Sequence, residues 1–87
     1  MLAQHTTVGY GSIVTVRREF STNTETYQIS FYTDLSRNIV SSEHPIGKGL
    51  MYHEKGDKVL VDDPKRYYFV EIVDIQNPPT NNEKEIK

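Results

Sequence analysis

Apolar and polar residues alternate over several short segments of the chain, and this pattern predicts a protein built mainly from β-strands. The cleanest alternation covers 26–33, where Tyr27, Ile29 and Phe31 share one face. Val14 with Val16, and Val59 with Val61, likewise share a face. Polar, turn-forming residues separate the segments. Five strands are predicted, at 13–20, 26–33, 39–41, 58–62 and 67–75.

One segment, 44–53, has the periodicity of a helix. Ile46, Leu50 and His53 follow the i, i+4, i+7 spacing of a single helical face. Pro45 suits the first helical position, where its missing N–H is not needed. The sequence therefore predicts one short helix between the third and fourth strands.

Two glycines make this helix weak by itself. Gly47 and Gly49 each oppose helix formation by about 1 kcal/mol relative to alanine. We therefore expect the sheet to hold the helix, with glycine allowing another backbone to approach closely. Ser42 or Glu43 is expected to cap the exposed amides at its start.

The element order β-β-β-α-β-β predicts an α+β domain in which one helix packs on an antiparallel sheet. An 87-residue chain is expected to form a single domain. We place this domain at residues 8–75. Residues 1–7 are expected to form a flexible arm or a trimmed boundary, and residues 76–87 a disordered polar tail.

The composition narrows the classes of function. The chain has no cysteine, which excludes disulfides and thiolate zinc sites, and no apolar run approaches the length of a membrane span. A net charge of -2 argues against binding nucleic acid mainly by neutralising phosphates. We expect a cytoplasmic protein with no cofactor, no metal and no membrane partner.

The serines beside the predicted helix do not form a convincing catalytic site. Ser41 and Ser42 lie near His44 in the sequence, but no third residue to orient the histidine can be named. The simpler interpretation is that both serines end a strand or cap the helix.

Metal binding and acid–base catalysis are equally weakly supported. His44 and His53 are too far apart for a one-turn zinc pair, and Glu43 and Glu54 supply no evident third ligand. The acidic pair at 62–63 precedes a proline in a predicted loop, where such residues favour turns.

The aromatic residues could line a peptide pocket or stack on single-stranded nucleic acid, but acidic residues interrupt the basic ones among them. We interpret most of them as core and cross-strand packing. The expected exceptions are Tyr32, Tyr52 and Tyr67.

Four segments, in this order and spacing, resemble the C-terminal domain of the bacterial Gre transcript-cleavage factors. They are VGYGS at 8–12, SS at 41–42 followed by PIGKGL at 45–50, KGDKV at 55–59, and the closing strand at 68–75. The resemblance covers residues 8–75. It implies a fold similar to the FK506-binding proteins, in which an antiparallel sheet curls around one short helix.

The resemblance also implies a partner, RNA polymerase. Gre factors place a long N-terminal coiled coil in the secondary channel, where its acidic tip acts in transcript cleavage. Their C-terminal domain docks at the channel rim on the coiled coil of the largest subunit. This sequence has no heptad stretch, so we expect a non-enzymatic domain that regulates transcription elongation by docking, either excised from a longer factor or standing alone. DNA contact, oligomeric state and the sign of regulation stay open.

If this chain docks as the Gre C-terminal domain does, the residues at the matching positions are Ser42, Pro45, Ile46 and Gly47. Leu50 is then expected in the core beneath them. Ile46 is interpreted either as an apolar anchor for the polymerase or as an inward-packing residue.

The sequence departs from the family pattern at this loop. Glu43 and His44 fall between the serine pair and the proline, and Gly49 replaces the usual alanine. These changes alter the loop that the family uses for contact, so a different partner or affinity stays an open alternative.

Two alternative functions follow from the same resemblance. A peptidyl-prolyl isomerase is suggested by the fold and the aromatics, although the chain lacks the tryptophan usual in that pocket. The other is a relative of the regulator of nucleoside diphosphate kinase, which shares this domain and also binds polymerase.

Overall fold

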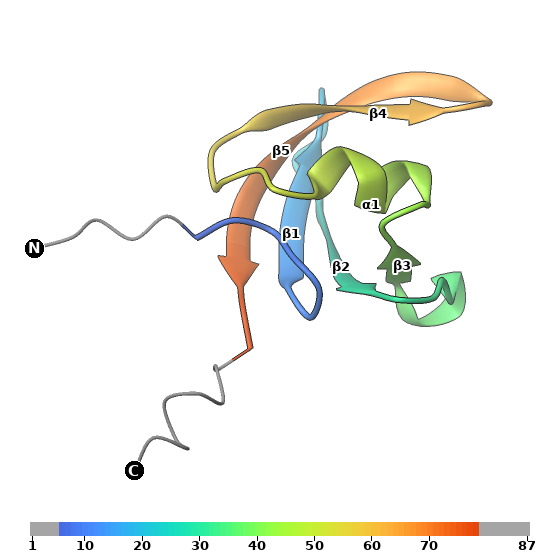
Figure 1. The fold of residues 1–87 in the computed structure, drawn as a ribbon. Helices are drawn as coiled ribbons and strands as arrows, with labels where there is room; N and C mark the ends of the chain where they lie inside the picture. The colour runs from blue at the N-terminus through green and yellow to red at the C-terminus, as the bar shows by residue number, and fades with distance from the viewer. Residues whose placement is uncertain (1–5, 79–87) are drawn as a thin grey trace, which may run out of the picture.

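The computed structural model describes residues 6–78, which form one five-stranded sheet with a short helix lying across it (Figure 1). The strand order in the sheet is β3-β2-β1-β5-β4. The elements in chain order are β1 (Ile13–Arg18), β2 (Thr24–Ser30), the 3₁₀ helix η1 (Leu35–Arg37), β3 (Ile39–Ser41), α1 (Pro45–Leu50), β4 (Lys58–Asp63) and β5 (Arg66–Gln76).

The predicted α+β fold is confirmed, with a mixed rather than purely antiparallel sheet. Strand β1 pairs antiparallel with both β2 and β5, and β4 pairs antiparallel with β5. Strand β3 instead runs parallel to β2, pairing Gln28 with Ile39 and Ser30 with Ser41. The reason is the connection over 31–38, which contains η1 and carries the chain back before β3 begins.

A β-bulge lets the long strand β5 curve around the helix. The register between β1 and β5 shifts between Thr15, which faces Asp74, and Val16, which faces Ile72. A bulge bends its strand and increases the local twist. Strand β5 can therefore pair with β1 and with β4 while sweeping across the fold, as Figure 1 shows.

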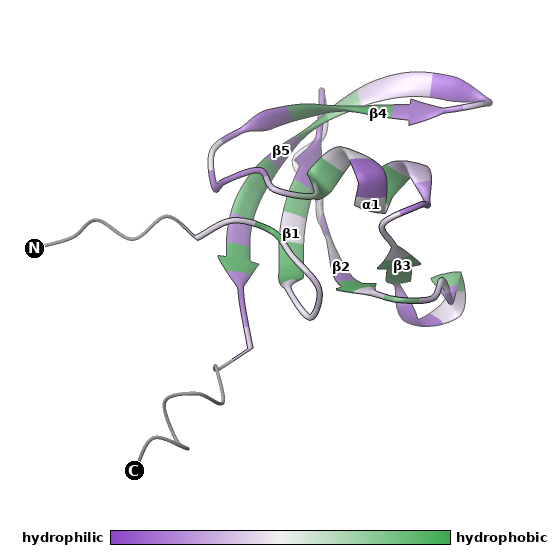
Figure 2. Ribbon diagram, viewed as in Figure 1, coloured by the Kyte–Doolittle hydropathy of each residue, from purple (hydrophilic) through white to green (hydrophobic). Residues whose placement is uncertain are grey.

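The core between sheet and helix is almost entirely aliphatic. Figure 2 shows the hydrophobic positions, in green, on the strands and on α1. The alternating valines of β1 and β4 are buried, which confirms the predicted strand faces. The fully or nearly fully buried apolar side chains are Val8, Val14, Val16, Ile29, Val40, Leu50, Val59, Val61, Val70 and Ile72.

The prediction that the aromatic residues mainly fill the core is wrong. Within residues 6–78 only Tyr27 is buried among the aromatics, whereas Phe31 and Phe69 are 80% and 44% exposed. The three expected exceptions are confirmed: Tyr32, Tyr52 and Tyr67 are 50%, 77% and 70% exposed. Compact β-branched side chains fill the space beneath a helix of only six residues. Phe31 leaves the face of Tyr27 because β2 ends one residue before it.

Several predicted boundaries move by a few residues. Strand β1 ends before Phe20, and β4 ends at Asp63, one residue later than predicted, so the acidic pair at 62–63 lies in a strand and not in a loop. Ordered structure also extends past the predicted domain limits: Thr7 bridges to Glu54, and Gln76 ends β5. The remainder of the predicted arm (1–5) and tail (79–87) lies outside the described residues.

Within the described part of the chain, none of the helices is both long enough and apolar enough to cross a membrane.

Candidate docking site

The start of α1 is capped by His44, not by Ser42 or Glu43 as expected. His44 has an extended backbone, and its Nδ1 accepts a hydrogen bond of 3.1 Å from the Ile46 N–H. Pro45 occupies the first turn, as predicted. Two residues separate Ser42 from Pro45, so His44 occupies the capping position immediately before the proline. Ser42 lies in the preceding turn.

The two helix glycines bring α1 against the backbone of the sheet, which confirms their predicted role. A Cβ at Gly47 would lie 2.0 Å from the carbonyl oxygen of Ser41. A Cβ at Gly49 would lie 3.1 Å from the carbonyl oxygen of Leu60. Glycine at both positions therefore lets one short helix sit close to β3 and β4 at once.

The four predicted docking residues differ in how deeply they are buried. Ser42 and Pro45 are partly exposed, whereas Ile46 is only 9% exposed and Gly47 is buried. Of the two interpretations of Ile46, inward packing therefore describes its position, and Leu50 is fully buried beneath it. Ser42 and Pro45 form an edge that Ile46 and Gly47 support from below.

Two aromatic residues that sequence reasoning did not place here adjoin this edge. The Tyr10 hydroxyl lies 2.9 Å from the Ser42 hydroxyl, within hydrogen-bond distance. The Tyr10 ring stacks on Phe31, with ring centroids 4.3 Å apart and an interplanar angle of 16°. Stacking holds both rings in place while each remains substantially exposed.

Tyr52 completes the surface on the other side of a shallow depression. The depression has a volume of about 250 Å³ and is lined by Tyr10, Ser42, Lys48, Met51 and Tyr52. Tyr52 has a φ of 70°, a left-handed conformation that a bulky residue seldom adopts. We define the docking surface as the exposed or partly exposed residues Tyr10, Phe31, Ser42, Pro45, Lys48 and Tyr52.

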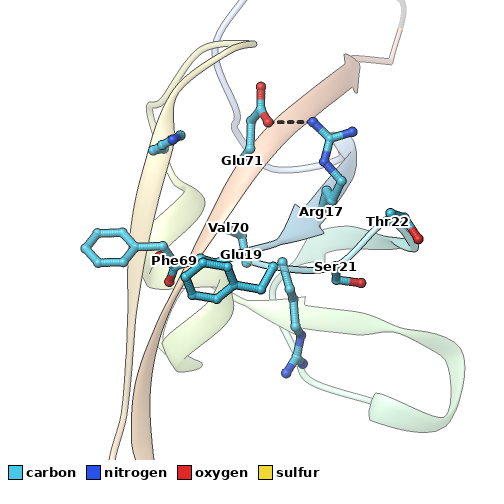
Figure 3. Close-up of a pocket in the computed structure, with 10 residues that line it drawn as sticks. Arg17, Glu19, Ser21, Thr22, Phe69, Val70 and Glu71 are labelled. Carbon is cyan, nitrogen blue, oxygen red and sulfur yellow. Dashed lines mark hydrogen bonds and ion pairs between the residues drawn. The ribbon is translucent and has the colours of Figure 1, made fainter.

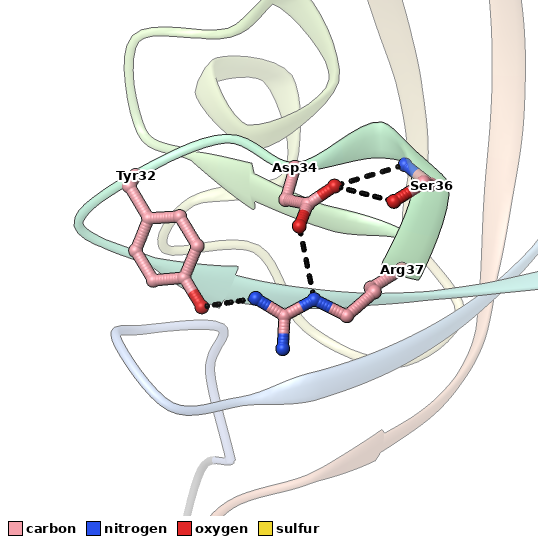
Figure 4. Close-up of polar contacts among 4 residues, drawn as sticks. All are labelled: Tyr32, Asp34, Ser36 and Arg37. Carbon is pink, nitrogen blue, oxygen red and sulfur yellow. Dashed lines mark hydrogen bonds and ion pairs between the residues drawn. The ribbon is translucent and has the colours of Figure 1, made fainter.

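A polar network holds the connection that carries Phe31 (Figure 4). Asp34 accepts hydrogen bonds from the Ser36 hydroxyl at 2.7 Å and from the Arg37 Nε at 2.9 Å. Arg37 in turn donates to the Tyr32 hydroxyl at 3.1 Å. The hydrogen bonds from Ser36, and then that from Arg37, lower the pKa of the Asp34 carboxyl, so Asp34 is ionised at neutral pH and forms an ion pair with Arg37.

Comparison with known proteins identifies the family. Residues 3–77 match the family model described as transcription elongation factor GreA/GreB, C-terminal. The chain belongs to this family.

Sequence and structural relatives agree with the match. The Gre domain is 36% identical to GreA of Mycoplasmopsis pulmonis over 62 residues, and 34% identical to GreA of Streptococcus mutans over 71 residues. These matches cover 69% and 79% of this chain but only 40% and 44% of the relatives, so the chain spans less than half of their length.

Solved structures of Gre proteins share the fold. GreA factor homolog 1 (Gfh1) of Thermus thermophilus superposes with a TM-score of 0.71 at 25% identity, covering 84% of this chain and 50% of that one. The GreA/GreB factor from Nitrosomonas europaea gives a TM-score of 0.68 at 25% identity, covering 85% and 63%.

The Gre motifs around the docking surface shape its backbone. In VGYGS, the Gly9 N–H donates to the Ser12 hydroxyl at 2.8 Å, and Gly11 has a φ of 89°. The turn that they form places Tyr10 at the tip. In KGDKV, the Gly56 N–H donates to the Ile72 carbonyl at 2.8 Å, which joins the turn before β4 to the middle of β5.

The two histidines within the described residues, His44 and His53, both have structural contacts. His44 uses Nδ1 in the helix cap, and His53 Nδ1 lies 3.2 Å from the Met51 carbonyl oxygen. Among residues 6–78 no group of three or more histidine, aspartate or glutamate side chains is arranged to hold a metal ion.

Proposed function

We propose that this Gre C-terminal domain binds RNA polymerase through the docking surface and thereby acts in the regulation of transcription elongation. Membership of the GreA/GreB family supports the partner, and the curated relatives are named transcription elongation factors. The observation that carries the site is the hydrogen-bond distance between Tyr10 and Ser42, which joins the VGYGS turn to the SS–PIGKGL segment. Two family motifs thereby form one exposed surface.

The docking surface has the chemistry of a protein-binding site. Exposed aromatic rings and a proline offer apolar contact area, and Tyr and other aromatic residues are enriched at interface centres. The depression beside Tyr52 can receive one apolar side chain, and the exposed Lys48 at its rim suits a neighbouring carboxylate. A helical surface presenting an apolar residue next to an acidic one fits this arrangement, as would the coiled coil of the largest subunit at the secondary-channel rim.

Rigidity of the surface favours binding as well. Pro45 has a restricted backbone, Tyr10 is stacked, and Gly47 holds α1 against β3. Little conformational entropy is then lost when a partner binds. The proposed role is docking without transcript cleavage.

The test is a titration of the fluorescently labelled chain with core RNA polymerase, with and without unlabelled full-length GreA as competitor. We expect saturable binding that GreA displaces. Ser42→Arg places a long cation against Tyr10 and should weaken binding by about thirtyfold or more, as at an interface hot spot. Pro45→Ala should weaken it less.

Tyr67→Ala is the matched control, because Tyr67 is 70% exposed on β5 and lies outside the docking surface. It should bind like the parent chain, and circular dichroism should show all variants folded. Binding of the parent that GreA does not displace would refute the shared rim site. Unchanged binding of Ser42→Arg would refute the docking surface.

A further inference from the structure

A larger recess lies where the β1–β2 turn meets β5, and it shares no residue with the docking surface (Figure 3). Its volume is about 670 Å³. The recess is lined by Arg17, Arg18, Glu19, Phe20, Ser21, Thr22, Lys58, Phe69, Val70 and Glu71. Beside it, Leu60 of β4 pairs with Phe69 of β5, and both side chains are more than two-fifths exposed.

Phe20 protrudes from the edge of this recess. It is 99% exposed and has a φ of 66°, a left-handed conformation in which a bulky side chain is an outlier. Glycine or asparagine would occupy this turn position without strain. The fold therefore presents a large apolar side chain to solvent where folding alone gives no reason for one.

The charges around the recess leave one cation and one anion without partners. Arg17 forms an ion pair of 2.6 Å with Glu71 across β1 and β5, as Figure 3 shows. Arg18 lies 3.4 Å from Glu25 and over the Tyr68 ring. Among residues 6–78, the side chains of Glu19 and Lys58 make no hydrogen bond or ion pair.

We propose that this surface binds a second copy of the chain about a two-fold axis, with Phe20 of each copy entering the recess of the other. A two-fold interface must be self-complementary, because the same patch meets itself. This patch is self-complementary in both shape and charge. It carries an apolar protrusion next to an apolar recess of ample volume, and an unpaired anion together with an unpaired cation.

In the proposed dimer, Phe20 packs against Phe69 and Val70 of the second copy, and Glu19 approaches Lys58 of the second copy. The dimer does not involve the docking surface and is independent of the proposed polymerase binding. Because the patch is small, we expect association in the micromolar to millimolar range.

The first measurement is analytical ultracentrifugation of the chain over a range of concentrations. The parent should show a reversible monomer–dimer equilibrium. Phe20→Ser should weaken dimerisation by about thirtyfold or more, because the side chain is lost from both halves of the interface. Phe31→Ser is the matched control: it removes a phenylalanine that is 80% exposed and lies outside the recess, and it should dimerise like the parent.

Charge reversal gives a second, more specific test. Glu19→Lys and Lys58→Glu should each weaken dimerisation about tenfold, because each creates two like-charge contacts in a symmetric dimer. The chain with both substitutions should recover most of the affinity, since the pair is restored with its signs exchanged. Glu43→Lys, on the turn before α1, is the control and should have no effect.

Three results would overturn the proposal. One is a chain that stays monomeric up to about 1 mM, and another is a dimer that Phe20→Ser does not weaken. The third is a monomeric chain whose binding to polymerase requires Phe20, because that result would assign the recess to polymerase instead. Since the dimer is measured without polymerase, its failure and the failure of polymerase docking are separate outcomes.

Discussion

Gly47 passes so close to Ser41 that a Cβ on the glycine would lie 2.0 Å from the serine carbonyl oxygen. Helix propensity alone favours alanine over glycine here by about 1 kcal/mol. The contact is with backbone, which cannot move aside without shifting β3. We therefore predict that Gly47→Ala lowers the free energy of unfolding by about 2–3 kcal/mol, as measured by urea denaturation.

Gly49→Ala is the matched control for this prediction. Its Cβ would lie 3.1 Å from the Leu60 carbonyl oxygen and 3.2 Å from the Val59 Cγ1. A shift of a few tenths of an ångström would relieve these contacts, so the change should stay within about 1 kcal/mol. Equal stabilities for the two variants would contradict the close approach of α1 to β3.

Tyr10→Phe is expected to affect binding more than stability. The substitution keeps the stack on Phe31 but removes the hydroxyl that lies beside Ser42. Because water can replace this exposed hydrogen bond, stability should change by less than about 1 kcal/mol. Affinity for polymerase should fall about fivefold, since Ser42 is then free to reorient before binding. Tyr67→Phe, which removes an exposed tyrosine hydroxyl outside the docking surface, should bind like the parent.

Tyr52 is predicted to limit stability while supporting binding. Its left-handed conformation costs an L-residue about 1–2 kcal/mol. Glycine adopts this conformation without strain, but part of the gain is lost because glycine has more backbone entropy in the unfolded state. Tyr52→Gly should therefore raise the free energy of unfolding by about 0.5–1 kcal/mol while weakening polymerase binding.

Tyr52→Ala separates the two effects of that substitution. Alanine loses the ring but retains the strained backbone, so binding should weaken to the same degree without any stabilisation. If Tyr52→Ala and Tyr52→Gly were equally stable, strain at this position would not be the cause.

Tyr27 gives the fold a dependence on alkaline pH. Burial, together with the hydrogen bond that its hydroxyl donates to Glu25, raises its pKa from 10.0 to about 12. Between these values the unfolded chain loses the phenolic proton and the folded chain keeps it. The unfolded state then binds fewer protons, so stability should fall as pH rises from about 10 toward 12.

Urea denaturation at a series of alkaline pH values measures this slope, and ultraviolet absorbance follows the phenolate directly. Tyr27→Phe should reduce the loss of stability over the same range. An unchanged slope in that variant would place the late titration on another tyrosine, with Tyr68 the first candidate because burial also raises its pKa.

The alternation of aliphatic residues was enough to predict the strands and the buried faces of β1 and β4. Every second residue of a strand points to the same face of the sheet, so the alternating valines identify the face that is buried. It failed for aromatic residues such as Phe31 and Phe69, where hydrophobicity indicated burial but the structure exposes the side chains. Their exposure depends on where each strand ends and on how little space a short helix encloses. Neither is a local property of the sequence.

The docking surface was predicted only in part for a similar reason. Ser42 and Pro45 lie close together in the sequence and could be identified together, whereas Tyr10 reaches Ser42 from 32 positions away. Ile46 and Gly47 belong to the same motif but face the core, because successive helix residues point in different directions. A sequence motif therefore identifies a segment, but only the fold shows which of its side chains are exposed.

The side chain of Asn77 joins the two ends of the described fold: its Oδ1 accepts from the Ser12 hydroxyl, and its Nδ2 donates to the Thr7 carbonyl at 3.2 Å. Thr7 and Asn77, near the two ends of the described fold, therefore lie at one corner of the domain. Pulling on both ends would load these few side-chain bonds before the strand ladder of β1 and β5.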